Sequence, residues 1–175
     1  SLSMEVLELS ERGHSVDDVY KAVKLIRQYD FKLGLQMMLG LPGDSFEKSL
    51  RTCLEFIKIN PDCVRIYPTL VIKDTYLERL CIEGNYEPMT LDDAIEQSTL
   101  YLMVFYLRKI DVIRVGLQPT ENIQLGKDVI AGPFHPAFRQ LVEANIYKVL
   151  FDLYFSKNEI LKENKELIIE AHKSK

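Results

Sequence analysis

The chain has 175 residues, of which 47% are hydrophobic and 27% are charged, and its net charge is −4. This length and apolar content suit one domain with its own core. The negative balance excludes a nucleic-acid binder that acts through bulk charge, but it is compatible with a local basic patch. No apolar run approaches the roughly 20 residues of a membrane span, and no signal-peptide pattern opens the sequence. We therefore expect a cytoplasmic protein with no membrane partner.

The three cysteines, Cys53, Cys63 and Cys81, are widely spaced. The sequence contains no CxxC pair and no CxxxCxxC motif. An odd number of cysteines without a framework indicates reduced, structural thiols. We expect no metal ligand among them.

The hydrophobic pattern alternates between helical and strand periods. In chain order it predicts helices at 3–11 and 15–29, a strand at 31–39, a helix at 44–57, a strand at 64–67, helices at 75–82 and 90–105, and a strand at 112–116. The run 31–39 is almost continuously apolar, which predicts a strand buried on both faces. Asp44 is the expected N-cap of the helix that follows. Short joints between the elements predict parallel strands with right-handed crossovers.

The alternation of helical and strand patterns ends after Gln118. An irregular loop is expected there, followed by a largely covered helix at 137–155 and a charged, amphipathic helix at 157–173. We expect two parts, a βα unit at 1–120 and a loop with a helical extension at 121–175. Three strands leave two sheet edges open, so we expect part of a larger fold, or a homodimer that pairs through an exposed edge.

Each predicted strand carries one polar residue in the middle of its apolar run: Gln36, Arg65 and Arg114. Buried polar side chains need partners. If these residues share one face, the two guanidinium groups would suit a carboxylate or a phosphate. Alternation places Gln118 on the same face as Arg114. The alternative is that each arginine pairs with a helix carboxylate near a strand end.

Two further residues lie at the predicted start of the helix near position 137. His135 precedes Pro136, and it suits either anion binding and proton transfer or an N-cap that packs in the loop. Arg139, one turn further on, would extend an anion site or lie in solvent.

Three segments together resemble a known enzyme family: Glu11-Arg-Gly-His14, Gly34-Leu-Gln-Met-Met-Leu-Gly-Leu-Pro-Gly-Asp44 and Val64-Arg-Ile-Tyr-Pro-Thr-Leu-Val-Ile-Lys-Asp-Thr75. They look like the second half of a radical S-adenosylmethionine enzyme of the Elongator catalytic-subunit-like branch. The oxygen-independent coproporphyrinogen oxidase branch is a more distant match. The segment Gly132-Pro-Phe-His-Pro-Ala-Phe-Arg139 is similar to the C-terminal signature of bacterial members that lack an acetyltransferase domain.

The resemblance implies an α/β fold: the C-terminal half of a partial (βα)6 TIM-like barrel with parallel strands, plus a C-terminal helical extension. In that family a CxxxCxxC loop holds a [4Fe–4S] cluster, and the cluster binds and cleaves S-adenosylmethionine. That loop is missing here, so we expect the chain to begin after the fourth strand. The cluster and S-adenosylmethionine are expected in the intact protein and not on this fragment.

Carried over residue by residue, the resemblance implies cofactor contacts from Arg12, Gln36, the Gly40-Leu41 backbone, and Tyr67 with Pro68. Gln36 stands where the family often has Asp. The candidates for substrate contacts are Arg65, Arg114, Gln118, His135 and Arg139. The resemblance provides no catalytic residue and no metal ligand within this chain.

We therefore expect an inactive fragment of a radical S-adenosylmethionine enzyme, whose partners are the missing N-terminal half of the barrel and a tRNA substrate. One alternative is a non-catalytic α/β binding or scaffolding domain. Others are a coproporphyrinogen-oxidase-like fragment, or a phosphate-ligand barrel enzyme that uses Arg65, Arg114 and His135.

Overall fold

A computed structural model describes residues 1–118, 123–124 and 126–157. Three parallel strands form its main sheet in the order β1 (Gly34–Leu39), β2 (Cys63–Pro68) and β4 (Asp111–Val115). Helix α3 (Phe46–Ile59) connects β1 to β2, and helix α5 (Leu91–Leu107) precedes β4. The expected α/β class and the expected parallel direction of the strands are confirmed.

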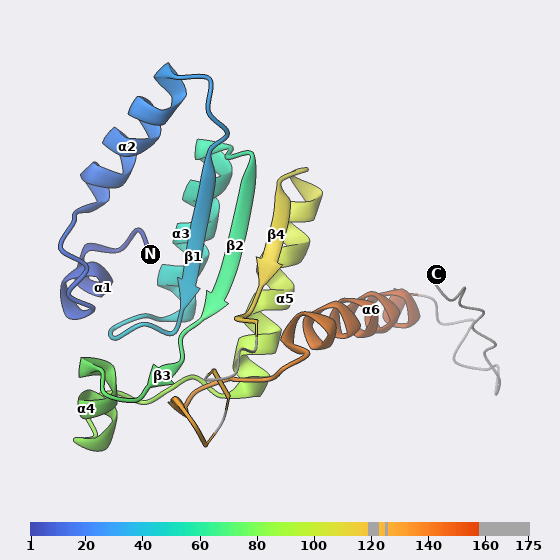
Figure 1. Ribbon diagram of the computed structural model, residues 1–175. Helices are drawn as coiled ribbons and strands as arrows, with labels where there is room; N and C mark the ends of the chain where they lie inside the picture. The colour runs from blue at the N-terminus through green and yellow to red at the C-terminus, as the bar shows by residue number, and fades with distance from the viewer. Residues whose placement is uncertain (119–122, 125, 158–175) are drawn as a thin grey trace, which may run out of the picture.

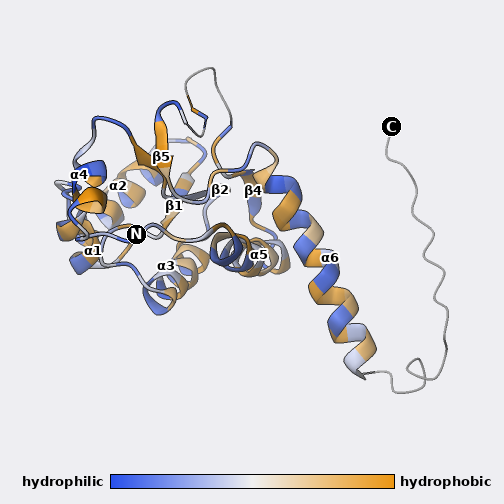
Figure 2. Ribbon diagram, turned by 90° about the horizontal axis from the view of Figure 1, so that it is seen from below, coloured by the Kyte–Doolittle hydropathy of each residue, from blue (hydrophilic) through white to orange (hydrophobic). Residues whose placement is uncertain are grey.

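One face of the sheet packs against helices. Figure 2 shows α3 and α5 side by side on the same side of the three strands. The core between these layers contains large side chains that are almost fully buried, among them Met37, Ile66, Tyr101, Leu102 and Phe105. Burial of such side chains contributes roughly 1.5–3 kcal/mol each.

The other face of the sheet is open, which corrects the expectation that β1 is buried on both faces. Along β1, Met37 and Leu39 are buried, whereas Gln36 is exposed and Met38 is half-buried. Figure 1 looks onto this open face, and no helix of the described residues lies in front of β2 or β4. An apolar strand is fully buried only where elements cover both of its faces, and here helices cover one.

The first two helices, α1 (Met4–Leu9) and α2 (Val16–Gln28), lie beside the β1 edge of the sheet (Figure 1). A capping box starts α2: the Ser15 side chain accepts a hydrogen bond from the Asp18 N–H, and the Asp18 carboxylate accepts one from the Ser15 N–H. Arg27 ties α2 to the end of α3 by donating to the carbonyls of Ile59 and Asn60. No residue of α2 is fully buried, so this helix presents a free flank.

The N-cap of α3 differs from the expected one. Ser45, not Asp44, takes that position, and its side chain accepts a hydrogen bond from the Lys48 N–H. Asp44 instead turns back toward the loop that precedes it. Both residues are good caps, and the loop contact of Asp44 decides between them.

Small elements cluster at the C-terminal ends of the strands. Two short strands that the sequence pattern did not predict, β3 (Val71–Ile72) and β5 (Val129–Ala131), form an antiparallel pair, and α4 (Tyr76–Ile82) packs beside β3. Such short strands carry too few residues to show a period.

The last described helix, α6 (Phe138–Lys157), contacts α5 and β4 and then extends away from the sheet (Figure 1). We expected it to be largely covered, but this is wrong for its second half. In that half Tyr147 and Tyr154 are exposed, and so are Leu150, Phe151 and Leu153. The predicted helix at 157–173 lies almost wholly outside the described residues. In the described part of the chain, no helix has the length and apolar character needed to cross a membrane.

Candidate functional site

The three polar strand residues form one row across the open face of the sheet. Gln36 of β1 pairs with Arg65 of β2, and Arg65 pairs with Arg114 of β4. All three side chains are exposed. The expected alignment of these residues is confirmed, and their role in binding stays a prediction.

A shift of register creates the second half of this row. Val64 pairs with Val112, but the next residue, Arg65, pairs with Arg114, so Ile113 is one residue more on β4. Regular alternation from the Val64–Val112 pair would turn Arg114 toward the helices. The extra residue leaves Ile113 and Arg114 on the open face, and it keeps Val112 and Val115 buried. Bulges of this kind redirect side chains and are frequent beside active sites.

Within the described residues, neither Arg65 nor Arg114 forms an ion pair with a carboxylate. Like charges on directly paired residues repel each other. The pair therefore lacks a protein counter-charge in the part of the chain that the structure describes, which argues against the helix carboxylate as its partner there.

Arg12 and Gln36 line one hollow beside the free edge of β1. Its volume is about 220 Å³, and His14 and Met38 also line it. The Arg12 guanidinium group lies against the Met38 sulfur. The His14 ring nitrogen Nδ1 lies 3.0 Å from the Arg12 carbonyl oxygen. The turn after α1 thus brings two expected cofactor residues together.

The loop after β1 is held by the carboxylate of Asp44. Its Oδ2 accepts hydrogen bonds from the Gly40 N–H at 3.0 Å and from the Ser49 hydroxyl at 2.8 Å, and its Oδ1 accepts one from the Ser45 N–H at 2.9 Å. The Gly40 carbonyl accepts a hydrogen bond from the Tyr86 hydroxyl at 2.5 Å. Both backbone polar groups of Gly40 are therefore already engaged.

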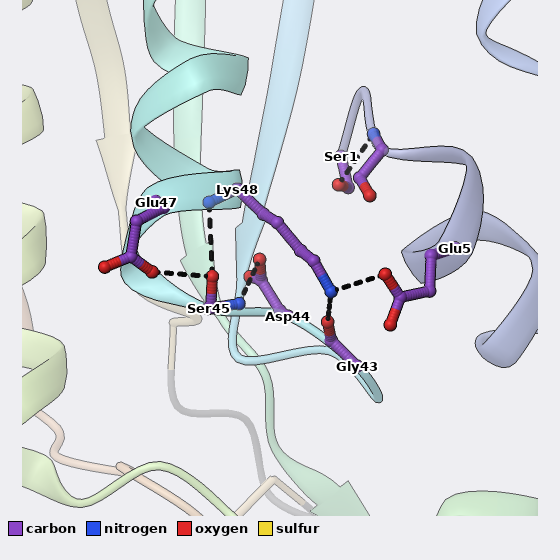
Figure 3. Close-up of polar contacts among 8 residues, drawn as sticks. Ser1, Glu5, Gly43, Asp44, Ser45, Glu47 and Lys48 are labelled. Carbon is purple, nitrogen blue, oxygen red and sulfur yellow. Dashed lines mark hydrogen bonds and ion pairs between the residues drawn. The ribbon is translucent and has the colours of Figure 1, made fainter.

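Lys48 joins this loop to the start of the chain. Figure 3 shows its side chain extending from α3 to Glu5 of α1 and to the Gly43 carbonyl. The Lys48 Nζ lies 2.8 Å from the Glu5 Oε2 and 2.6 Å from the Gly43 oxygen. Since Glu5 is well exposed, we assign this ion pair a positioning role with a small energy, about 0–1 kcal/mol.

The other expected cofactor residues lie apart from the Arg12 hollow. Gly40 and Leu41 line a different cavity of about 380 Å³, between the loop after β1 and the segment before α5. Tyr67 and Pro68 are buried at the end of β2. The structure therefore does not place these four residues in one cavity with Arg12 and Gln36.

Three of the expected substrate residues meet at the other edge of the sheet. Arg114, Gln118 and Arg139 line a hollow of about 310 Å³ between β4 and the start of α6. Arg139 also has protein partners: its Nε donates to Glu143 Oε1 at 2.8 Å, and its Nη1 donates to the Val112 carbonyl at 3.3 Å. These contacts fix α6 against the free edge of β4.

His135 takes part in the turn that leads into α6. Its Nδ1 accepts a hydrogen bond from the Ala137 N–H at 3.1 Å, and it does not line the hollow of Arg114. This is the capping geometry of the loop alternative. In this tautomer Nε2 carries the proton, so His135 retains one donor.

The described residues do not fit an iron–sulfur cluster. They contain no group of three or more His, Cys, Asp or Glu side chains placed to hold a metal. All three cysteines are free thiols. Burial raises the pKa of Cys53 to about 12, so this thiol stays protonated and is a poor ligand.

Four residues of the site region were not among the sequence-predicted site residues: His14, Met38, Asp44 and Tyr86. Two carried a usable signal, because His14 and Met38 stand two positions from Arg12 and Gln36. The sequence pattern favours Asp44 as a helix N-cap instead. Tyr86 lies 46 residues from its partner Gly40, and no local pattern indicates such a contact.

Comparisons with known proteins agree with this geometry. The model of the Radical_SAM C-terminal domain family matches residues 61–148. The chain is 38% identical over 95 residues to a tRNA uridine(34) acetyltransferase of Methanocaldococcus jannaschii, covering 53% of this chain and 18% of that protein. It is 32% identical over 99 residues to human Elongator complex protein 3, covering 55% of this chain and 18% of that protein.

A solved structure, the archaeal Methanocaldococcus infernus Elp3 with an N-terminal deletion, superposes with a TM-score of 0.71 at 30% identity. That match covers 85% of this chain and 34% of the solved chain. The chain thus spans about a fifth to a third of the length of these relatives. With its parallel strands, its open polar face and the match over residues 61–148, the chain belongs to the Radical_SAM C-terminal domain family.

Proposed function

We propose that this chain forms part of the barrel wall of a radical S-adenosylmethionine enzyme that modifies tRNA, and that its open sheet face lines the reaction chamber. One observation carries the proposal: Gln36, Arg65 and Arg114 form a polar row on a sheet face that the described helices leave uncovered. A barrel wall has such a face, because its helices lie outside and the opposite face of its strands points into the barrel.

The relatives support the substrate class. Those cited above are a tRNA uridine(34) acetyltransferase and Elongator complex protein 3. A wobble uridine is therefore the substrate we propose for the intact protein. Acetyl transfer does not follow, since the chain spans only 18% of either relative.

In this proposal Arg12 and Gln36 bind the cofactor. The hollow that they share provides a cationic fork and an amide, which together can hold a carboxylate and a hydroxyl group. When bound, S-adenosylmethionine would supply radical chemistry, with the electron coming from a cluster held elsewhere in the full-length protein. Two contacts hold the elements around this hollow in place. The Asp44 carboxylate fixes the loop after β1, and Lys48 holds α1 close to that loop.

The experiment uses the full-length protein, with its iron–sulfur cluster reconstituted anaerobically and reduced with dithionite. We expect it to bind S-adenosylmethionine and to release 5′-deoxyadenosine. The variants Arg12→Met and Gln36→Leu should weaken binding about tenfold or more each, the usual effect of losing a hydrogen bond to a charged group. Equilibrium dialysis with labelled cofactor measures the binding, and chromatography measures the product.

Lys24→Met is the matched control, because Lys24 lies exposed on α2 outside the Arg12 hollow. It should bind the cofactor like wild type. Full-length protein that neither binds S-adenosylmethionine nor forms 5′-deoxyadenosine would contradict the proposal. Unchanged binding with lowered stability in the Gln36 variant would favour a scaffolding role for the sheet.

A further inference from the structure

The geometry points to an oxyanion-binding site formed by Arg65 and Arg114 on the open face of the sheet. This inference rests on the proposed function, because it names which substrate group the chamber holds. Its ligand is the phosphate of a nucleotide or a carboxylate of similar size, and we favour the phosphate because the proposed substrate is a tRNA.

The extra residue in β4 brings the two arginines together. Without it, Ile113 would face Arg65, and Arg114 would turn toward the buried side chains of α5. The register shift at Arg65 instead places the two arginines directly opposite each other. Neighbouring strands lie about 4.8 Å apart, so one anion can contact both guanidinium groups. Their planar forks suit two oxygen atoms of the same group.

The arginine pair also places two positive charges side by side on the open face. Arg65 and Arg114 repel each other, and among the described residues no carboxylate forms an ion pair with either. Nearby Arg139 shows the opposite arrangement, because its guanidinium group is taken up by Glu143 and the Val112 carbonyl. Among the described residues, the same region therefore contains one arginine with a carboxylate partner and two arginines without one.

Both arginines are accessible to a ligand. A hollow of about 350 Å³ lies over Gln36 and Arg65, and another of about 310 Å³ reaches Arg114 and Gln118. Gln36 and Arg65, which line the first hollow, and Arg114, which lines the second, are all exposed side chains. Together they offer room on both sides of the arginine pair for the remainder of a ligand whose anionic group lies between them.

The test compares matched ligands that differ only in the anion, using the full-length protein and isothermal titration calorimetry. Uridine 5′-monophosphate is compared with uridine, and S-adenosylmethionine is compared with its decarboxylated analogue. We expect wild type to prefer uridine 5′-monophosphate by about tenfold or more. Arg65→Met and Arg114→Met should each abolish most of that preference, and Arg114→Lys should restore part of it, because lysine keeps the charge but lacks the fork.

Arg108→Met is the control for net charge. Arg108 is the exposed C-cap of α5, the helix that packs behind β4. Its replacement should leave the phosphate preference unchanged. A thermal melt of each variant checks that the protein is folded before binding is compared.

Loss of the preference only in the cofactor pair would identify the carboxylate as the anion and would still support the oxyanion site. The inference is overturned if wild type shows no preference in either pair. It is overturned equally if both methionine variants keep the wild-type preference. A lower melting temperature with an unchanged preference would indicate that the arginines pair with a carboxylate elsewhere in the full-length protein. Failure to cleave S-adenosylmethionine would overturn the proposed function alone, because the uridine comparison needs no cluster.

Discussion

The carboxylate of Asp44 lies across the loop that follows β1, with its Oδ2 atom 3.0 Å from the Gly40 nitrogen. One side chain thereby joins the end of a strand to the start of the next helix. Gly40 has a positive φ of 71°, which few other residues adopt easily. Glycine lets the loop take this conformation without strain, and the Asp44 carboxylate then holds the loop against the start of α3.

Replacement of Asp44 by Ala should lower the free energy of unfolding by about 1–3 kcal/mol, because it removes three hydrogen bonds to a partly buried carboxylate. Urea denaturation measures the change. Asp92→Ala is the control, since Asp92 is exposed in the first turn of α5 and should cost no more than about 0.5 kcal/mol. Equal effects of the two replacements would show that the loop contacts of Asp44 add nothing.

Tyr86 should make stability depend on alkaline pH. Burial raises its pKa to about 12, with smaller contributions from Cys81 and Asp44. Above about pH 10 the unfolded chain loses the phenolic proton while the folded chain keeps it, so stability falls as the pH rises from about 10 to 12. Between pH 9 and pH 11 we expect Tyr86 to contribute a loss on the order of 1 kcal/mol.

Denaturant midpoints at the two pH values measure this loss. Tyr86→Phe should show a shallower decline, and at pH 8 it should be less stable by about 1 kcal/mol through the lost hydrogen bond to Gly40. Tyr147→Phe, at an exposed position of α6, should decline like wild type. If the three proteins declined in parallel, the buried phenol would not be the cause.

Two glycines with the same backbone angle separate strain from crowding. Gly116 has φ +75° and Gly84 has φ +74°. A Cβ atom at Gly116 would lie 2.7 Å from a ring carbon of Phe138, whereas one at Gly84 would meet nothing within 4 Å. Gly84→Ala should therefore cost roughly 1–2 kcal/mol for the left-handed conformation alone.

Gly116→Ala should cost that amount and about 1–3 kcal/mol more, because Phe138 must move and α6 with it. Thermal melts of both variants give the comparison. If both variants melted at the same temperature, Phe138 would not pack tightly over the end of β4.

Two leucines of α5 test the position of the core. Leu102 is fully buried, and Leu107 is 80% exposed. Leu102→Ala should cost about 2–5 kcal/mol through the cavity that it leaves. Leu107→Ala should change the free energy of unfolding by no more than about 0.5 kcal/mol. A large effect at Leu107 in the full-length protein would show that another part of the protein covers this helix end.

Hydrophobic periodicity was enough to predict the main architecture. The three parallel strands and six of the helices follow from apolar runs and capping residues such as Ser15 and Thr90. The pattern failed where the tertiary environment decides. It did not show which face of β1 stays open, because an apolar run looks the same whether one or two layers cover it.

The sequence pattern predicted the candidate site only where the strands are regular. The pairing of Gln36 with Arg65 follows from the alignment of two regular strands. The pairing of Arg65 with Arg114 depends on an extra residue, and no composition rule shows on which strand such a residue falls. The contact of Tyr86 with Gly40 joins residues far apart in sequence, so only the folded chain reveals it.

The extra residue in β4 also bears on how this strand can change in length during evolution. Loss of Ile113 would leave Val112, Arg114 and Val115 in regular alternation, each on the face that it occupies now. Loss of Val112 or Val115 would instead remove a side chain from the core. Among homologous sequences, single-residue gaps in this strand should therefore fall at Ile113, and the arginine after the gap should keep its place opposite Arg65.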